Sequence, residues 1–153
     1  MTSDLHPRPS PATPVERRRV RAHLREAFRV EVEVRDGRFS FVSDQGPEDG
    51  GADAGPVPSE FLFSSLASCF AMAMAWSARK RRVILPDLEV IVSWGYDKPE
   101  RMYDDIRIEA RSSLATLAPE QFEALVRLAE QVCWVTRTIQ RGRPITVQAA
   151  VRE

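Results

Sequence analysis

Residues 58–82 read PSEFLFSSLASCFAMAMAWSARKRR, and this stretch decides the fold. Between Phe61 and Ala78 it carries no charged residue, and its apolar residues would cover every face of a helix. A helix that is apolar on all sides is typical of the centre of a core or of a membrane span. Ser59 can cap the helix, the basic residues at the other end suit its carboxyl terminus, and Pro86 prevents extension. The stretch therefore predicts one helix of about six turns.

The uncharged part of this helix spans 18 residues, which is long enough for a membrane crossing. Its hydrophobicity is nevertheless modest, because alanine supplies much of the remainder and serine stands at positions 64, 65, 68 and 77. The mean hydropathy of the whole chain is −0.31. We therefore expect the central helix of a protein core and no membrane partner.

The composition is that of a single globular domain. The chain has 153 residues, of which 43% are hydrophobic and 29% are charged. Its net charge is zero, so no overall basic surface points to nucleic acid. Both histidines, His6 and His23, lie near the N-terminus, and two cysteines alone form neither a disulfide scaffold nor a metal cluster. No apolar leader opens the sequence, so we expect a cytoplasmic protein without metal or other cofactor.

The part of the chain before the helix predicts a tail, a hairpin and a loop. Residues 1–22 contain four prolines and few large apolar groups, so we expect a disordered tail ahead of a domain over residues 23–153. From residue 25 apolar and charged residues alternate as in a half-buried strand, and Asp36-Gly37 predicts the turn into a second strand. Residues 46–58, rich in glycine, proline and acids, predict a mobile loop.

The part after the helix predicts a second hairpin and a second long helix. Strands are expected over residues 88–94 and 103–111, followed by an amphipathic helix from Pro119 to about Cys133. A short helical segment and a last strand over residues 145–151 would close the chain. The predicted order is β-β-α-β-β-α-β, with hairpins in place of regular βαβ units, which indicates the α+β class.

The two cysteines are the candidate reactive groups. Cys69 lies in the middle of the apolar helix, where a cysteine is most often a small core residue. Cys133 lies at a helix junction, and Arg137 follows it by one turn. Helix ends and cations can acidify a thiol. The residues alone leave a structural and a reactive role open for both cysteines.

A family resemblance favours the reactive role. The pattern GGADAGPVPSEFLFSSLASCFAMAM (residues 50–74), followed by CWVTRTI (residues 133–139) and a final strand, resembles the OsmC/Ohr family over residues 28–151. The resemblance implies an OsmC-like α+β fold in which two chains intertwine as a homodimer around the cysteine-bearing helices. It also implies a thiol peroxidase of the oxidative stress response, with peroxiredoxin-like activity on organic hydroperoxides and a dithiol or lipoyl-type reductant. By this resemblance Cys69 is the peroxidatic cysteine and Cys133, its neighbour in space, is the resolving one.

The resemblance further implies an arginine beside the peroxidatic sulfur, which would favour the thiolate, and a glutamate that would orient the arginine. Arg29, on the first predicted strand, is the first choice for this cation. Arg35 and Arg38 flank the Asp36-Gly37 turn. Arginines of a strand that simply face solvent are the alternative explanation for all of them.

Glu60 is the candidate glutamate at the helix start, one residue after the family position, which Ser59 occupies. It precedes Cys69 by nine residues, or about 900° of helical rotation, so the two side chains fall on opposite faces of a continuous helix. The alternative role for Glu60 is to cap the helix or to contact a neighbouring strand.

Two functions are consistent with the sequence. The first is a cysteine-based organic hydroperoxide reductase, and the second is a non-enzymatic dimeric protein that binds a small apolar or thiol-reactive ligand. A helix apolar on all faces, with one other long helix to cover it, also predicts an extensive homodimer interface. The residues that could line an apolar pocket, or alternatively form the core, are Phe61, Phe63, Phe70, Met72, Met74 and Trp76.

Overall fold

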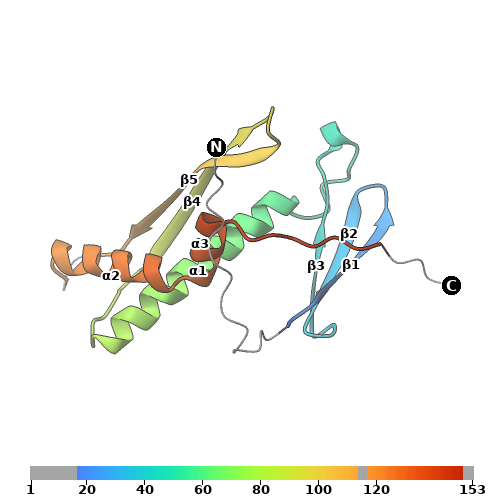
Figure 1. Cartoon of the computed structure of the whole chain (residues 1–153). Coiled ribbons are helices and arrows are strands. Elements are labelled where there is room, and N and C mark those ends of the chain that lie inside the picture. Colours follow the sequence, from blue (N-terminus) through green and yellow to red (C-terminus); the bar gives the residue numbers. More distant parts are fainter. Residues whose placement is uncertain (1–16, 114–116, 150–153) are drawn as a thin grey trace. The chain divides into compact units, whose positions relative to one another are not determined.

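The computed structural model describes residues 17–113 and 117–149 and consists of two compact units, Met1–Val57 and Pro58–Glu153 (Figure 1). Most of the predicted tail, residues 1–22, lies outside the described residues. Its last three residues do not belong to a tail, because strand β1 begins at Val20. The elements are small sheets and three α-helices, which confirms a mixed α+β protein.

The N-terminal unit is an antiparallel sheet in the order β1-β2-β3, formed by Val20–Glu26, Arg29–Val34 and Phe39–Ser43. The hairpin predicted at Asp36-Gly37 is present, and Gly37 adopts a φ of +87°, which glycine tolerates without strain. The separate strand β1 was not predicted. A turn at Ala27 and Phe28 divides the alternating segment, and it contains no glycine, proline or asparagine that would have marked it.

The loop before the first helix is organised by one buried carboxylate. Asp44 accepts hydrogen bonds from the backbone N–H groups of Gln45, Ala52 and Ala54 at 2.8, 3.1 and 3.2 Å. The hydroxyl of Ser43 donates to the carbonyl of Pro56 at 2.9 Å. The segment that the sequence analysis expected to be a mobile loop therefore carries a fixed set of contacts and a short 3-10 helix.

The C-terminal unit contains helix α1 (Pro58–Lys80), the hairpin of β4 (Glu89–Asp97) and β5 (Met102–Arg111), and helices α2 (Pro119–Val132) and α3 (Trp134–Arg141). These elements agree with the predicted ones to within a few residues. Helix α1 already includes Ser59, which was expected as its cap and is instead buried in the first turn.

The predicted final strand does not form in the described chain. Residues 142–149 have no regular secondary structure, and residues 150–151 lie outside the described part. Ile145 and Val147 are both 88% exposed. A strand needs a neighbour for its backbone hydrogen bonds, and this segment pairs with no strand among the described residues. The observed order is therefore β-β-β-α-β-β-α-α, and the predicted order β-β-α-β-β-α-β is wrong.

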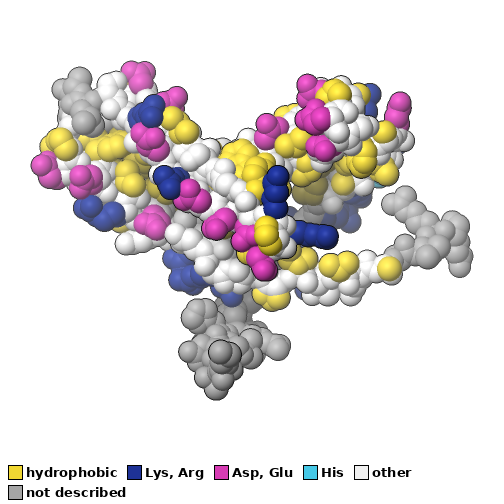
Figure 2. Space-filling view, turned by 90° about the horizontal axis from the view of Figure 1, so that it is seen from above, with side chains coloured by type: hydrophobic (Ala, Val, Ile, Leu, Met, Phe, Trp, Pro, Cys, Tyr) yellow, Lys and Arg dark blue, Asp and Glu magenta, His cyan; other side chains and the backbone are white. Residues whose placement is uncertain are grey.

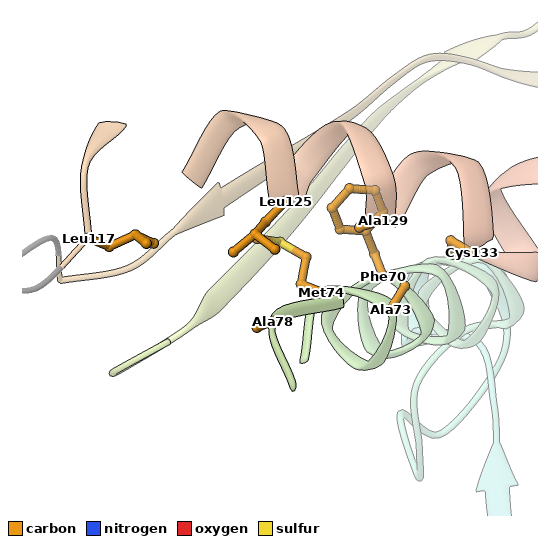
Figure 3. Packing of buried hydrophobic residues seen from close by; sticks show 8 residues of the cluster. All are labelled: Phe70, Ala73, Met74, Ala78, Leu117, Leu125, Ala129 and Cys133. Carbon is orange, nitrogen blue, oxygen red and sulfur yellow. The ribbon is translucent and has the colours of Figure 1, made fainter. Parts of the chain in front are cut away.

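The core lies where α1 packs against α2, with half-buried residues of β4 and β5 beside it. Met74 of α1 and Ala129 of α2 are completely buried, and Leu125 of α2 is 1% exposed. Figure 3 shows the side chains of the two helices facing one another across this core, with Cys133 at one end of it. The periodic apolar residues of α2 thus serve as predicted, as one face of an amphipathic helix.

Helix α1 is buried on one face only, which corrects the expectation of burial on all sides. Phe63, Leu66, Phe70, Met74 and Ser77 recur every three or four residues and are buried. The exposed side carries large apolar residues too: Leu62, Trp76 and Met72 are 40, 50 and 71% exposed. By length and composition alone α1 could cross a membrane, and 39% of its most apolar 18-residue stretch is buried inside the protein.

The Asp44 anchor leads to a pH-dependent prediction. Burial acts to raise the pKa of the Asp44 carboxyl, but the three N–H donors, together with the charge of Arg29, hold that pKa below its ordinary value. A group whose pKa is lowered by folding stabilises the fold above its unfolded pKa of about 3.9. This stabilisation is lost as the pH falls through the folded pKa.

We therefore expect Asp44→Ala to lower the midpoint of urea unfolding at neutral pH and to differ less from wild type near pH 2. Asp53→Asn is the matched control, because Asp53 is exposed in the same loop and asparagine tolerates its positive φ. Equal unfolding midpoints for Asp44→Ala and wild type at neutral pH would contradict this account of the loop.

Candidate active site

The packing of α1, α2 and α3 places two cysteines beside one another. Cys69 stands in the middle of α1 at the border of its buried face and is half-buried. Cys133 is 1% exposed and separates α2 from α3, with an extended backbone at φ −69° and ψ 112°. Its N–H closes α2 by donating to the carbonyl of Ala129 at 2.8 Å, and its own carbonyl accepts from Arg137 in the first turn of α3.

The two thiols are free and lie near one another, because Cys69 packs against the buried cluster that contains Cys133 and both residues line one cavity. The predicted proximity of Cys69 and Cys133 is therefore present, although the two residues are far apart in the sequence.

The surroundings give the two thiols opposite acidities. Burial raises the pKa of Cys69; the backbone N–H of Val135 acts to lower it, and the neighbouring Cys133 raises it again. Burial also acts to raise the pKa of Cys133, but the nearby Thr136 side chain, the first-turn N–H groups of α3 and Cys69 outweigh it, although the sulfur makes no capping hydrogen bond of regular geometry. The pKa of Cys133 is consequently lowered. Helix N-termini are known to acidify cysteines in this way.

Thr136 is a site residue that the sequence analysis missed. Its side chain is 5% exposed, and its hydroxyl makes no hydrogen bond of regular geometry among the described residues. The sulfur of Cys133 is the group whose negative charge it would stabilise. The signal was available in the sequence, because Cys133 and Thr136 have the spacing of a helix cap and its third residue.

An apolar cavity of about 440 Å³ opens beside the sulfurs. Met72 and Trp76 line it, as predicted, whereas Phe63, Phe70 and Met74 belong to the core. Such a cavity suits the apolar part of a small molecule. Its full set of lining residues is Cys69, Met72, Ala73, Trp76, Val132, Cys133 and Trp134.

The other two predicted site residues lie elsewhere in their units. Arg29 belongs to β2 of the N-terminal unit, where it is exposed and its charge acts on Asp44. Glu60 is exposed in the first turn of α1. Since α1 is continuous, Glu60 and Cys69 of one chain lie about 13.5 Å apart along the axis and on opposite faces. The roles of Arg29 and Glu60 beside the thiols stay predictions.

Within residues 17–113 and 117–149, no group of three or more His, Cys, Asp and Glu side chains gathers as a metal site would. The site offers two sulfurs, a helix N-terminus and an apolar cavity. This arrangement can perform thiol chemistry on a small apolar partner.

Solved structures with the same fold come from several bacteria. An organic hydroperoxide resistance protein OsmC from Legionella pneumophila has a TM-score of 0.68 at 24% identity, over 85% of this chain and 93% of that one. An OsmC-like protein from Mycoplasma pneumoniae has a TM-score of 0.66 at 18% identity, over 82% and 88%. The organic hydroperoxide resistance protein OhrB of Bacillus subtilis has a TM-score of 0.59 at 20% identity, over 81% and 90%.

At these identities the likeness concerns the fold alone. A comparison with curated proteins by sequence gives no significant match. The sequence itself matches the family described as OsmC-like protein over residues 50–148, a range that includes α1, both cysteines and α3. The chain therefore belongs to the OsmC-like protein family.

Proposed function

We propose that this protein is a cysteine-based thiol peroxidase that reduces organic hydroperoxides, with Cys69 as the peroxidatic and Cys133 as the resolving cysteine. The observation that carries the proposal is the proximity of two free cysteines at the wall of one apolar cavity. The names of the Legionella and Bacillus structures, which refer to organic hydroperoxide resistance, support the same chemistry.

In the proposed cycle the Cys69 thiolate attacks the O–O bond of the hydroperoxide, which breaks to release the alkoxide. The alkoxide takes up a proton and leaves as the alcohol, while Cys69 becomes a sulfenic acid. Cys133 then attacks the Cys69 sulfur, which releases water and forms a disulfide. A dithiol reductant restores both thiols and is itself oxidised to a disulfide.

The cavity favours an alkyl hydroperoxide over hydrogen peroxide, because Met72, Trp76 and Trp134 can cover an apolar substituent. Only a thiolate attacks a hydroperoxide efficiently, and the pKa of Cys69 is raised. A nearby positive charge is therefore required to favour the Cys69 thiolate. We propose that the cation which meets this requirement is Arg29.

The alternative is a non-enzymatic homodimer that binds a small apolar or thiol-reactive ligand in this cavity. The raised pKa of Cys69 in the single chain favours it, because an un-ionised thiol in an apolar wall is a poor nucleophile. Consumption of cumene hydroperoxide in the presence of a dithiol separates the two functions.

We also propose that the protein is a homodimer. The exposed side of α1 carries Leu62, Met72 and Trp76, and Trp134 beside the cavity is 83% exposed. The sheet of the N-terminal unit exposes further apolar residues, and Figure 2 shows apolar side chains on the visible surface of each unit. Exposed apolar surface on this scale is typical of a protein–protein interface.

The proposed roles of the cysteines predict two different defects. Cys69→Ser should abolish hydroperoxide turnover, because a serine hydroxyl cannot be oxidised to a sulfenic acid. Cys133→Ser should reduce one equivalent of peroxide per chain and then stop, with Cys69 held as a sulfenic acid that overoxidises. Mass spectrometry of each variant after peroxide treatment measures this. If both variants keep their hydroperoxide turnover, the peroxidase cycle is excluded.

The proposed cation is tested by Arg29→Met. Loss of the charge should lower the fraction of Cys69 present as thiolate and slow its reaction with hydroperoxide about tenfold at neutral pH. Arg25→Met is the matched control, because Arg25 is an exposed arginine of the same sheet that pairs with Glu31 at 2.6 Å. Stopped-flow rates over a range of pH report the effect. Unchanged rates in Arg29→Met would remove Arg29 from the site.

The proposed dimer is tested by sedimentation. We expect about twice the chain mass of 17.3 kDa at micromolar concentration. Met72→Glu should dissociate the dimer, because a charge would be buried at the centre of the apolar face. Gln121→Glu adds the same charge at an exposed position of α2 and should leave the dimer intact. A monodisperse monomer for the wild type would refute the proposal.

A further inference from the structure

The first turn of α3 lies beside both sulfurs, although the Cys133 sulfur makes no capping hydrogen bond of regular geometry. The N–H groups of Val135 and Thr136 act on the Cys133 sulfur, and those of Trp134 and Val135 act on Cys69. The first amides of a helix have no partner within the helix, so they are free to bind a negative group. Cys133 stands at the cap position, where its sulfur occupies the place that an anion takes at a helix N-terminus.

A second observation points to the same sulfur. The hydroxyl of Thr136 is buried and lacks a hydrogen bond of regular geometry, although a buried polar group without a partner is costly. A thiolate at Cys133 would give this hydroxyl a strong, charge-assisted acceptor. The hydroxyl therefore suits the ionised state of Cys133 better than the neutral state.

Access to the two sulfurs differs in a way that complements their electrostatics. Cys133 is 1% exposed, so it offers little surface to an incoming thiol, although it also lines the cavity. Cys69 is half-buried and lies in the wall of the cavity. In thiol–disulfide exchange the accessible sulfur is attacked, and the sulfur that is more stable as a thiolate leaves.

We propose that Thr136 is a positioning residue that, with the first turn of α3, holds the Cys133 sulfur as a thiolate, so that a reductant opens the Cys69–Cys133 disulfide by attacking Cys69. A thiolate of the dithiol forms a bond to the Cys69 sulfur, the Cys69–Cys133 bond breaks, and Cys133 departs with the electron pair. The second thiol of the reductant then displaces Cys69. The dithiol loses two electrons and two protons. One proton ends on Cys69 and the other in solvent.

Few other charges act on Cys133 in the described residues. Cys69 on α1 is the titratable group in contact with it. Arg137 on α3 directs its guanidinium to the carbonyl of Gln131 at 2.8 Å, and Glu130 on α2 accepts from Gln140 at 3.1 Å. A change in the acidity of Cys133 can therefore be assigned to the donors of α3 and to Cys69.

The first experiment titrates Cys133 alone by thiolate absorbance in the Cys69→Ser variant, whose serine keeps a donor next to Cys133. We expect a midpoint below the ordinary cysteine value of about 8.5 and below that of Cys69 in Cys133→Ser. Adding Thr136→Val should raise the midpoint, whereas Thr136→Ser should preserve it. A Cys133 midpoint at or above that of Cys69, or one that Thr136→Val leaves unchanged, would overturn the proposal.

The second experiment identifies the attacked sulfur and needs no peroxidase activity. The disulfide is made with diamide and treated with 2-mercaptoethanol and excess iodoacetamide, and Cys69 and Cys133 are then read in separate tryptic peptides, residues 39–79 and 128–137. We expect the mercaptoethanol adduct on Cys69 and the alkyl group on Cys133. Thr136→Val should slow this opening about threefold or more, and Thr136→Ser should restore it.

An adduct on Cys133, or adducts shared equally between the cysteines, would overturn the proposal, as would a failure of diamide to join them. This inference rests on the disulfide of the proposed function, but its failure is distinguishable from the failure of that function. A protein that does not consume hydroperoxide can still give the expected adduct, and an active peroxidase can give the wrong one.

Discussion

The packing of α1 against α2 is the constraint on which the rest of the candidate site depends. The buried face of α1 repeats every three or four residues, and Phe70 and Met74 meet the apolar face of α2 at Leu125 and Ala129. This contact fixes the end of α2, and with it Cys133, next to the middle of α1, where Cys69 stands. Closely packed helices tolerate little displacement, so the distance between the sulfurs is set by the core.

The same arrangement separates the properties of two chemically identical side chains. Cys69 lies on a helix wall, where burial dominates and its pKa rises. Cys133 caps α3, where N–H groups and the Thr136 hydroxyl outweigh the effect of burial and its pKa falls. An apolar wall suits the organic part of a substrate, and a helix N-terminus suits a departing thiolate. A peroxidatic Cys69 therefore needs a further positive charge near its sulfur to favour the thiolate.

Much of this fold follows from local patterns in the sequence. The uncharged stretch of α1, the alternation in β4 and β5 and the Pro119 start of α2 each carry a strong periodic signal. Strand β1 was not predicted because the turn at Ala27 contains no residue typical of turns. The strand expected at Ile145 does not form, because no strand in the described chain pairs with it. Whether an alternating segment becomes a strand depends on such a partner, which composition does not reveal.

The candidate site was predictable in part for the same reason. Both cysteines were found through the pattern around them and through the family resemblance, and their contact follows from helix packing. Thr136 was missed because its importance lies in a buried hydroxyl without a hydrogen-bond partner, and burial depends on the tertiary structure. The half-exposed state of α1 was missed because an apolar sequence does not say whether its second face is covered by the same chain or by another.

The reaction of the fully reduced protein with organic hydroperoxide tests the central claim most directly. Cumene hydroperoxide and hydrogen peroxide are each mixed with the protein, and the rates are compared with that of free cysteine at the same pH. The account predicts that the protein reacts much faster with cumene hydroperoxide than with hydrogen peroxide, and much faster than free cysteine does. The protein product should have lost two hydrogens through formation of a Cys69–Cys133 disulfide. A rate no greater than that of free cysteine would contradict it and would leave the ligand-binding function as the better explanation of the cavity.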